Sequence, residues 1–554
     1  MPENNISNIA AHLPVMAGTN PHTPAVICPT KTDAYGNYSY VHYTLSQLNR
    51  QSDILASALE KVNIEKGVRT VLMVKPSLDF FALTFALFKV GAVPILIDPG
   101  IGVKKLKPSI REAEPEAFIG IPRAQLARIL LGWGKETIRT SITVGRKFGW
   151  GGYTLDELYE MGKDIKEYSM PEIKPDDMAA ILFTSGSTGP SKGVIYTHRV
   201  FNRQIELLKQ VYNIQPGEKD FATFPLFALF GPTLGMTAII PDMDASCPAK
   251  SDPEKLFKTI HDFGPTNMFA SPALINLLSK YGEKQKLKIE SLKRVISAGA
   301  PANPESLERF SNLLRSGIEI FTPYGATEAL PVCNIGSKEI LEETGKLTRQ
   351  GKGACVGFPV DGITLKIIRI SDDPIEKWSD ELELPVNEIG EIVVKGKNVT
   401  AGYYNRPDSN RVSKIADMQN GGFYHRMGDV GYKDENARVW FCGRKSHRVV
   451  TESKTLFTIP TEALFNNHSE VFRTAIVGPV KNKKVYPVLC VEKEKNTKIE
   501  DTTLKNELRE IARKNGLEDD IKDILFHRSF PVDVRHNAKI FREELTQWAQ
   551  AKIR

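Results

Sequence analysis

Residues 181–193 read Ile-Leu-Phe-Thr-Ser-Gly-Ser-Thr-Gly-Pro-Ser-Lys-Gly, and this stretch is the strongest indication of the fold class of the chain. Three apolar residues typical of a buried strand lead into a loop with three glycines, five hydroxyl residues, a proline and Lys192. Glycines let the backbone approach an anion, hydroxyl and N–H groups donate hydrogen bonds, and a lysine adds positive charge. The stretch therefore predicts a phosphate-binding loop at the end of a strand.

A flexible surface loop is the alternative interpretation of a run rich in glycine and serine. The apolar residues before the loop and the further apolar run 194–196 after it favour the phosphate loop. A Walker loop is excluded, because that pattern places serine or threonine directly after the lysine, whereas Gly193 follows Lys192.

The order of residues 184–193 closely resembles the phosphate loop of the acyl-adenylate-forming (AMP-binding) superfamily, which contains acyl-CoA synthetases, peptide-synthetase adenylation domains and luciferases. The resemblance implies an α/β fold, with a large N-terminal domain of stacked mixed or parallel sheets flanked by helices and a small, mobile α+β domain at the C-terminus. It also implies that the loop binds the nucleotide. The residues concerned are Thr184, Ser185, Gly186, Ser187, Thr188, Gly189 and Lys192.

Length and composition are those of an ordinary globular enzyme. A chain of 554 residues is too long for one hydrophobic core, so we expect two or more domains. The net charge of +7 is modest, and acidic and basic residues are interspersed, which argues against a nucleic-acid partner. Six cysteines without metal spacing and a polar N-terminus without a signal pattern predict a reduced, cytoplasmic protein.

The run 80–97 is nearly all apolar, with Lys89 as its single charged residue. A membrane-spanning helix needs about 20 apolar residues, whereas a glycine and a proline break this run. We therefore expect a buried helix over 80–90 and a buried strand over 92–97, and no membrane span. Together with the strand-like run 70–74 they predict a βαβ unit of a parallel sheet.

Two segments after the phosphate loop predict the adenine and metal sites. Residues 267–270 and 294–297 are strand-like runs, and the second ends in Ala298-Gly299-Ala300-Pro301, which resembles the turn that lies against adenine in the superfamily. The hexapeptide 323–328, a strand-ending turn if taken alone, resembles the fifth core motif of the superfamily. Its residues suit their implied roles, since a tyrosine can stack on a purine, a threonine can donate to phosphate and a glutamate can bind Mg²⁺. The implied nucleotide-binding residues are Gly299, Ala300, Pro301, Tyr324 and Gly325, with Thr327 and Glu328 in catalysis and Glu328 on the metal.

The ribose site and the domain boundary are implied by the next motifs. Asp429 lies in the run 423–431 and matches the aspartate that accepts hydrogen bonds from both ribose hydroxyls. Arg444 ends the run 441–444 and matches an arginine that also contacts the ribose. In the superfamily a hinge follows this arginine, so we predict a large domain over 1–444, with the ATP and acyl sites, and a small domain over 445–554.

The small domain is expected to carry the catalytic lysine. The superfamily motif is proline, four or five polar residues and then Gly-Lys-Ile, whereas residues 531–540 are slightly longer and have Ala538 in place of the glycine. Lys539 still precedes Ile540, so the resemblance assigns the catalytic role to Lys539. A solvated surface lysine is the alternative.

An apolar segment predicts one wall of the acyl site. Residues 224–231 read Phe-Pro-Leu-Phe-Ala-Leu-Phe-Gly, and many superfamily members have a histidine where this chain has Ala228. Such a segment suits a pocket for a hydrophobic acyl chain. Ordinary core packing is the alternative for each residue taken singly.

Departures from the superfamily pattern point to one branch. The runs 227–231, 443–447 and 535–543 resemble the β-lactone synthetases of the bacterial long-chain olefin pathway. The stretch 452–458 lacks the glycine that borders the pantetheine tunnel of acyl-CoA synthetases, which argues against thioester formation. The branch implies ATP-dependent conversion of a long-chain 2-alkyl-3-hydroxy acid into acyl-AMP and pyrophosphate, and then attack of the β-hydroxyl to give a β-lactone and AMP.

The resemblance implies ATP and Mg²⁺ as cofactors and a hydrophobic acyl substrate, with no requirement for coenzyme A. A long-chain fatty acid–CoA ligase, which forms an acyl-CoA thioester, is the alternative enzyme. A nucleotide-binding protein without catalysis is the alternative of another class. His447 and His536 are the candidates for the base of the second step, and assembly with other enzymes of the same pathway and the oligomeric state stay open.

Overall fold

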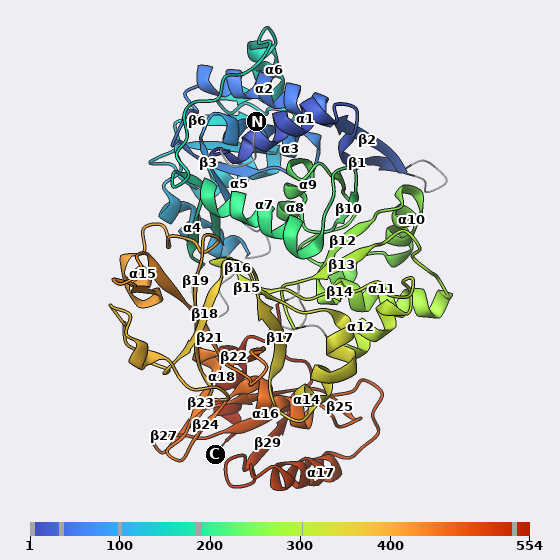
Figure 1. The fold of residues 1–554 in the computed structure, drawn as a ribbon, viewed down its shortest axis with the longest axis vertical. Helices are drawn as coiled ribbons and strands as arrows, with labels where there is room; N and C mark the ends of the chain where they lie inside the picture. Colours follow the sequence, from blue (N-terminus) through green and yellow to red (C-terminus); the bar gives the residue numbers. More distant parts are fainter. Residues whose placement is uncertain are drawn as a thin grey trace.

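The computed structural model describes residues 6–32, 38–97, 102–183, 191–301, 303–533 and 540–553. Within these ranges the chain forms three large sheets, a three-stranded C-terminal sheet and two two-stranded sheets. Figure 1 shows the N-terminal elements at the top, strands β15 to β22 below them and the C-terminal elements at the bottom. This mixed α/β architecture confirms the predicted fold class.

The first sheet is parallel except at one edge, where β1 and β2 pair antiparallel. Helices α10, α11 and α12 cover one face of this sheet and share a core with it. The predicted strands 267–270 and 294–297 are confirmed as β12 and β13. In spatial order the strands are β14 (Ile320–Phe321), β13 (Arg294–Ser297), β12 (Asn267–Ala270), β10 (Lys219–Ala222), β11 (Thr237–Ile239), β1 (Pro24–Thr32) and β2 (Tyr38–Thr44).

The second sheet is also parallel except at one edge, where β8 and β9 flank the phosphate loop as an antiparallel pair. The predicted βαβ unit is confirmed as β3, α3 and β4. The apolar helix α3 begins after Ser77, whose hydroxyl accepts from the N–H of Phe80 and caps the first turn. In spatial order the strands are β7 (Tyr153–Thr154), β6 (Thr140–Thr143), β5 (Ala117–Gly120), β3 (Arg69–Met73), β4 (Val93–Ile97), β8 (Met178–Phe183) and β9 (Gly193–Thr197).

The largest hydrophobic core lies between these two sheets and contains residues of α2, α3 and α7. Helices α4 and α5 pack on the opposite face of the second sheet. No helix of the described residues is long and apolar enough to cross a membrane. The helices of this part are α1 (His12–Thr19), α2 (Leu45–Lys61), α3 (Leu78–Lys89), α4 (Val103–Ala113), α5 (Pro122–Leu131), α6 (Leu155–Gly162), α7 (His198–Tyr212), α8 (Pro225–Ala228), α9 (Phe230–Thr233), α10 (Pro253–Phe263), α11 (Pro272–Gln285) and α12 (Pro304–Ser311).

The third sheet is antiparallel and lies below the first two in Figure 1. Its order is β15 (Tyr324–Ala326), β16 (Ala329–Asn334), β17 (Ala354–Pro359), β22 (Val439–Arg444), β21 (Phe423–Lys433), β19 (Gly390–Lys395) and β18 (Thr364–Ile368), with β20 (Lys414–Ala416) beside β21. Three short helices accompany it: α13 (Ser337–Glu339), α14 (Gly345–Arg349) and α15 (Pro407–Ser413).

The C-terminal part has its own small sheet, with helices on both faces. Strand β28 lies in the middle, antiparallel to β25 and parallel to β29. The elements are β23 (Val449–Val450), β24 (Thr455–Leu456), α16 (Thr458–Phe465), β25 (Val471–Val477), β26 (Val480–Lys481), β27 (Lys484–Val485), β28 (Val488–Lys493), α17 (Asp501–Lys514), β29 (Asp523–Phe526) and α18 (Arg542–Lys552).

Candidate functional site

The hairpin of β15 and β16 presents Thr327 and Glu328 at its turn. Gly325 is needed here, because a Cβ at this position would lie 2.5 Å from the backbone oxygen of Ala329 on the facing strand. The hydroxyl of Tyr196 on β9 donates to the backbone oxygen of Thr327 at 2.6 Å. The hairpin turn is therefore fixed against the strand that follows the phosphate loop.

Glu328 and Lys192 both contact Tyr403, the first at its hydroxyl and the second over its ring. The hydroxyl of Tyr403 donates to Glu328 Oε1 at 2.7 Å, and Lys192 Nζ lies 4.7 Å from the centroid of the Tyr403 ring. Burial, followed by the charge of Glu328, raises the pKa of Tyr403, so this phenol stays a hydrogen-bond donor. A carboxylate and an ammonium held a ring apart can bind a divalent cation and a phosphate side by side.

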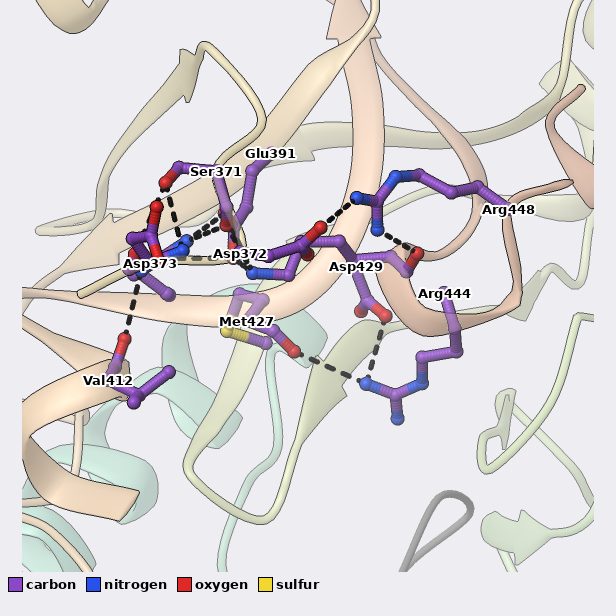
Figure 2. Close-up of polar contacts among 11 residues, drawn as sticks. Ser371, Asp372, Asp373, Glu391, Val412, Met427, Asp429, Arg444 and Arg448 are labelled. Atoms are coloured by element: carbon purple, nitrogen blue, oxygen red, sulfur yellow. Dashed lines mark hydrogen bonds and ion pairs between the residues drawn. The ribbon is translucent and has the colours of Figure 1, made fainter. Parts of the chain in front are cut away.

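Asp429 and Arg444 are register partners on the neighbouring strands β21 and β22. Arg444 Nη1 lies 2.9 Å from Asp429 Oδ1 and donates to the backbone oxygen of Met427 at 3.2 Å, as Figure 2 shows. The hydroxyl of Tyr324 donates to Asp429 Oδ2 at 2.6 Å. Burial raises the pKa of the Asp429 carboxyl, and the Arg444 guanidinium and the Tyr324 hydroxyl act in the opposite direction.

A cavity of about 1660 Å³ joins these polar groups to a large apolar surface. Several predicted site residues line it, whereas Asp429 and Tyr324 do not: Asp429 contacts the lining residue Arg444, and Tyr324 donates to Asp429. Ala300 and Pro301 follow Gly299 directly and are not among the lining residues. The predicted residues that line the cavity are Lys192, Gly299, Gly325, Thr327, Glu328 and Arg444.

The apolar part of the cavity is built largely from phenylalanines. In the segment 224–231, Ala228 is fully buried and packs in the core, whereas the prediction of a pocket wall is confirmed for its neighbours. The ring of Phe227 stacks on Phe269 of β12, with centroids 4.1 Å apart and an interplanar angle of 15°. The two alternatives therefore apply to different residues of one segment: Ala228 packs in the core, and its neighbours form the pocket wall. The lining residues of this segment are Phe224, Pro225, Leu226, Phe227, Leu229 and Phe230.

Several predicted residues lie outside the described part of the chain. These are the phosphate-loop residues 184–189, the catalytic candidate Lys539 and the base candidate His536. His447, the other base candidate, lies with Nε2 3.6 Å from Oε1 of Glu543 and is not among the residues that line the cavity. The structure therefore does not bring His447 to the predicted reaction site.

Sequence reasoning missed three polar residues near Glu328. Tyr403 lines the cavity and donates to Glu328. Lys414 donates to the backbone oxygen of Thr400 at 2.6 Å, and burial lowers its pKa to about 7. Its register partner His425 is also buried, which lowers its pKa well below the usual value. No spacing signal marks these residues, because contacts between distant strands bring them together.

A dense ion-pair network fixes the segment that follows Arg444 (Figure 2). The buried carboxylate of Glu391 accepts from Arg426 Nη2 at 2.7 Å and lies 3.2 Å from Lys445 Nζ. Arg448 pairs with Asp372 at 2.5 Å and donates to the backbone oxygen of Lys445. The start of the C-terminal part is thereby fixed to the third sheet beside the candidate ribose site.

The donor set around Glu328 suits Mg²⁺ rather than a fully protein-bound metal. Within the described ranges no group of three or more His, Cys, Asp or Glu side chains gathers to hold a metal ion. Mg²⁺ commonly keeps several waters and binds through one or two carboxylates and the phosphates of its nucleotide. Glu328, which lines the cavity together with Lys192, is a carboxylate that matches that pattern.

Residues 15–404 match the family model described as AMP-binding enzyme. Over the whole chain, the sequence is similar to two curated proteins named olefin beta-lactone synthetase. The protein from Stenotrophomonas maltophilia is 45% identical, over 99% of this chain and 99% of its own. The protein from Xanthomonas campestris is 44% identical, over 98% of each chain.

Two solved structures share the fold. The amide bond synthetase McbA from Marinactinospora thermotolerans is 19% identical, with a TM-score of 0.76 over 98% of this chain and 99% of that one. ATP-bound MatB from Rhodopseudomonas palustris is 18% identical, with a TM-score of 0.77 over 99% of this chain and 100% of that one. At such low identity these likenesses describe the architecture alone.

Proposed function

Because this chain belongs to the AMP-binding enzyme family, we propose that it uses ATP to activate a long-chain 2-alkyl-3-hydroxy acid and then closes a β-lactone. The 45% identity with an olefin beta-lactone synthetase over 99% of both chains carries this proposal. The cavity supports it, since one continuous space of about 1660 Å³ has charged groups in one part and phenylalanines in another. An enzyme that adenylates a hydrophobic acid needs both.

The first step joins two anions, so the protein must cancel their repulsion and hold the α-phosphate in line for attack. Lys192 and the loop 184–189 would hold the departing pyrophosphate, and Lys539 would lie between the carboxylate and the α-phosphate. Glu328 would hold Mg²⁺, which neutralises phosphate charge when bound. The hydroxyl of Tyr403, donating at 2.7 Å, keeps Glu328 in one orientation.

The nucleoside would lie across the third sheet. Asp429 and Arg444 would contact the ribose hydroxyls, since the carboxylate accepts and the guanidinium keeps further N–H groups beyond its Nη1 contacts. Adenine would lie between the ring of Tyr324 and the turn 299–301. Tyr324 would then have two roles, because its hydroxyl also orients Asp429.

In the second step the β-hydroxyl oxygen forms a bond to the activated carbonyl carbon, and the bond from that carbon to the AMP oxygen breaks. The hydroxyl proton leaves, and the products are the β-lactone and AMP. A cavity that holds the hydroxyl near the carbonyl favours this reaction, since effective molarities on the order of 10⁵ M arise between well-oriented neighbours. Coenzyme A has no part in this reaction.

We propose further that residues 445–554 act as a mobile domain that carries Lys539 to the site on the large domain, 1–444. The contacts of Lys445 with Glu391 and of Arg448 with Asp372 would set one position of this domain. Movement would require these pairs to break.

Product analysis with and without coenzyme A tests the proposed function. The purified protein is incubated with ATP, Mg²⁺ and a long-chain 2-alkyl-3-hydroxy acid, and the products are identified by mass spectrometry. We expect AMP, pyrophosphate and a β-lactone in both reactions. Turnover that depends on coenzyme A and yields a thioester would identify the alternative, a fatty acid–CoA ligase.

A further inference from the structure

The N-terminal segment 6–11 forms part of the wall of the apolar part of the cavity. Ile9, in the short 3₁₀ helix Ile9–Ala11, lines the cavity and is 4% exposed. Phe88 of α3 also lines the cavity and is 5% exposed. Both side chains are therefore almost completely shielded from solvent and are available to contact a chain bound in the cavity.

A row of aromatic rings leads from the hairpin turn to this part of the wall. The hydroxyl of Tyr196 contacts the backbone of Thr327, and its ring centroid lies 4.8 Å from that of Phe201 on α7. The Phe201 ring lies 5.8 Å from Phe88 and 6.2 Å from Phe230. Tyr196, Phe201, Phe88 and Phe230 all line the cavity, so one apolar wall runs from the reaction site to the N-terminal segment.

Hydrogen bonds fix this segment to the helices around the cavity. The amide of Asn8 donates to the backbone oxygen of Phe88 at 2.9 Å, and the N–H of Ile9 donates to His198 Nδ1 at 3.1 Å. Asn202 donates through Nδ2 to the backbone oxygens of residues 6 and 7, at 2.8 and 3.0 Å. Burial lowers the pKa of His198 to about 4, so Nδ1 remains an acceptor at neutral pH.

We propose that residues 6–11 act as an end stop of the acyl cavity, and that Ile9, Phe88 and Phe201 set the greatest chain length that the enzyme accepts. The proposal rests on the proposed function in one respect, namely that the cavity takes a long hydrocarbon chain. It goes beyond that function, because it assigns chain-length specificity to a segment that precedes residue 15, where the match to the family model begins.

Truncating the stop should lengthen the preferred substrate. Ile9→Ala frees the space of about three methylene-sized groups. Each further methylene that the enlarged cavity buries should raise affinity about fourfold. We therefore expect the best chain length to rise by about two or three carbons in Ile9→Ala, and Ile9→Trp to shorten it.

Two other variants separate an end stop from a general loss of packing. Leu13→Ala is the matched control, because Leu13 is fully buried in the same core on α1 but does not line the cavity. It should lower stability without changing the chain-length profile. Asn202→Ala removes the two bonds to the segment and should widen the profile toward longer chains, as expected of a positioning residue.

The test measures two quantities on the full chain over a series of 2-alkyl-3-hydroxy acids of increasing chain length. The dissociation constant is obtained by displacement of a fluorescent fatty acid, and pyrophosphate release reports turnover. A longer optimum in Ile9→Ala and an unchanged one in Leu13→Ala support the end stop. Profiles that are unchanged in Ile9→Ala, or equally shifted in Leu13→Ala, would overturn it. Binding of these hydroxy acids without pyrophosphate release from any of them would instead refute the proposed function.

Discussion

Two ion pairs of this molecule each have a buried carboxylate but differ in how fully their cationic donors are used. Lys89 Nζ contacts Asp53 Oδ1 at 2.6 Å, and Asn49 Oδ1 and O at 2.8 and 3.1 Å, so each of its three N–H groups has an acceptor. Arg444 uses Nη1 for both Asp429 and Met427. In the part of the chain that the structure describes, its Nε and Nη2 contact no acceptor.

The Lys89–Asp53 pair serves stability, and the Arg444–Asp429 pair serves binding. The Lys89 pair joins α2 to α3, is 1% and 7% exposed and is absent from the cavity lining, so it has nothing left to offer a ligand. Arg444 lines the cavity with unused donors. A buried ion pair whose N–H donors all have acceptors stabilises the fold, whereas an ion pair at a cavity with unused N–H donors can bind a polar ligand.

Asp53→Ala should give the largest effect. Removing one partner leaves Lys89 buried without its counter-ion, which typically costs about 3 to 5 kcal/mol of unfolding free energy. Urea denaturation should show this loss, while ATP kinetics of the folded fraction stay unchanged. The double variant Asp53→Ala, Lys89→Met should recover most of the stability. A loss of unfolding free energy below about 1 kcal/mol in the single variant would contradict a stabilising role for the Lys89–Asp53 pair.

Asp220 differs from both ion pairs, because its buried carboxyl group has a neutral partner. The amide of Asn267 donates to it at 2.5 Å. Burial raises its pKa from an ordinary 3.8 to about 7. Below pH 4 the Asp220 carboxyl is protonated in both the folded and the unfolded state, so its full contribution to the unfolding free energy is present. Between about pH 4 and 7 only the unfolded state ionises, and stability should fall by up to roughly 4 kcal/mol.

Denaturation curves across that pH window measure this effect, with Asp220→Asn as the matched variant. Asparagine mimics the neutral acid and still offers an oxygen to Asn267, so its stability should vary less between pH 4 and 7. Equal pH dependence in both proteins would show that Asp220 is not the titrating group.

Asp429→Ala should act on ATP rather than on the fold. Losing two charged hydrogen bonds to the ribose, at about 1.5 kcal/mol each, should lower kcat/KM for ATP roughly 10²-fold. Asp417→Ala is the control, since Asp417 is also buried and paired, with Lys395 at 2.6 Å, but its partner does not line the cavity, whereas Arg444, the partner of Asp429, does. Similar losses for ATP in both variants would contradict the ribose role.

Tyr324→Phe should have the smallest effect. It removes the hydroxyl that donates to Asp429 at 2.6 Å but keeps the ring. One such bond contributes about 1 kcal/mol, so KM for ATP should rise roughly fivefold. Steady-state kinetics with varied ATP measure it. A rise as large as that of Asp429→Ala would mean that the hydroxyl itself contacts the nucleotide.

The fold could be predicted far into its details because local patterns determine it. The apolar run 80–97, broken by glycine and proline, became α3 and β4, and the strand predicted over 267–270 has those bounds in the structure. Thr327, Glu328 and Arg444 could also be predicted, since each lies in a compact motif. All three line the cavity.

The rest could not be predicted, because it depends on contacts between distant parts of the chain. Tyr403 meets Glu328 across 75 positions of the sequence, and Ile9 meets His198 across 189. Neither pair has a spacing that a single sequence reveals. Likewise, alternation of apolar residues does not show that Ala228 faces the core while Phe227 and Phe230 face the cavity.

The most direct test of adenylation followed by ring closure follows the carboxylate oxygens. The substrate acid is labelled with ¹⁸O in both carboxylate oxygens and incubated with ATP and Mg²⁺, and AMP and lactone are analysed by mass spectrometry. We predict that the phosphate of AMP contains one ¹⁸O atom and that the carbonyl of the lactone contains the other. The ring oxygen of the lactone should be unlabelled. AMP without ¹⁸O would contradict it, because the carboxylate would then never have been joined to the α-phosphate.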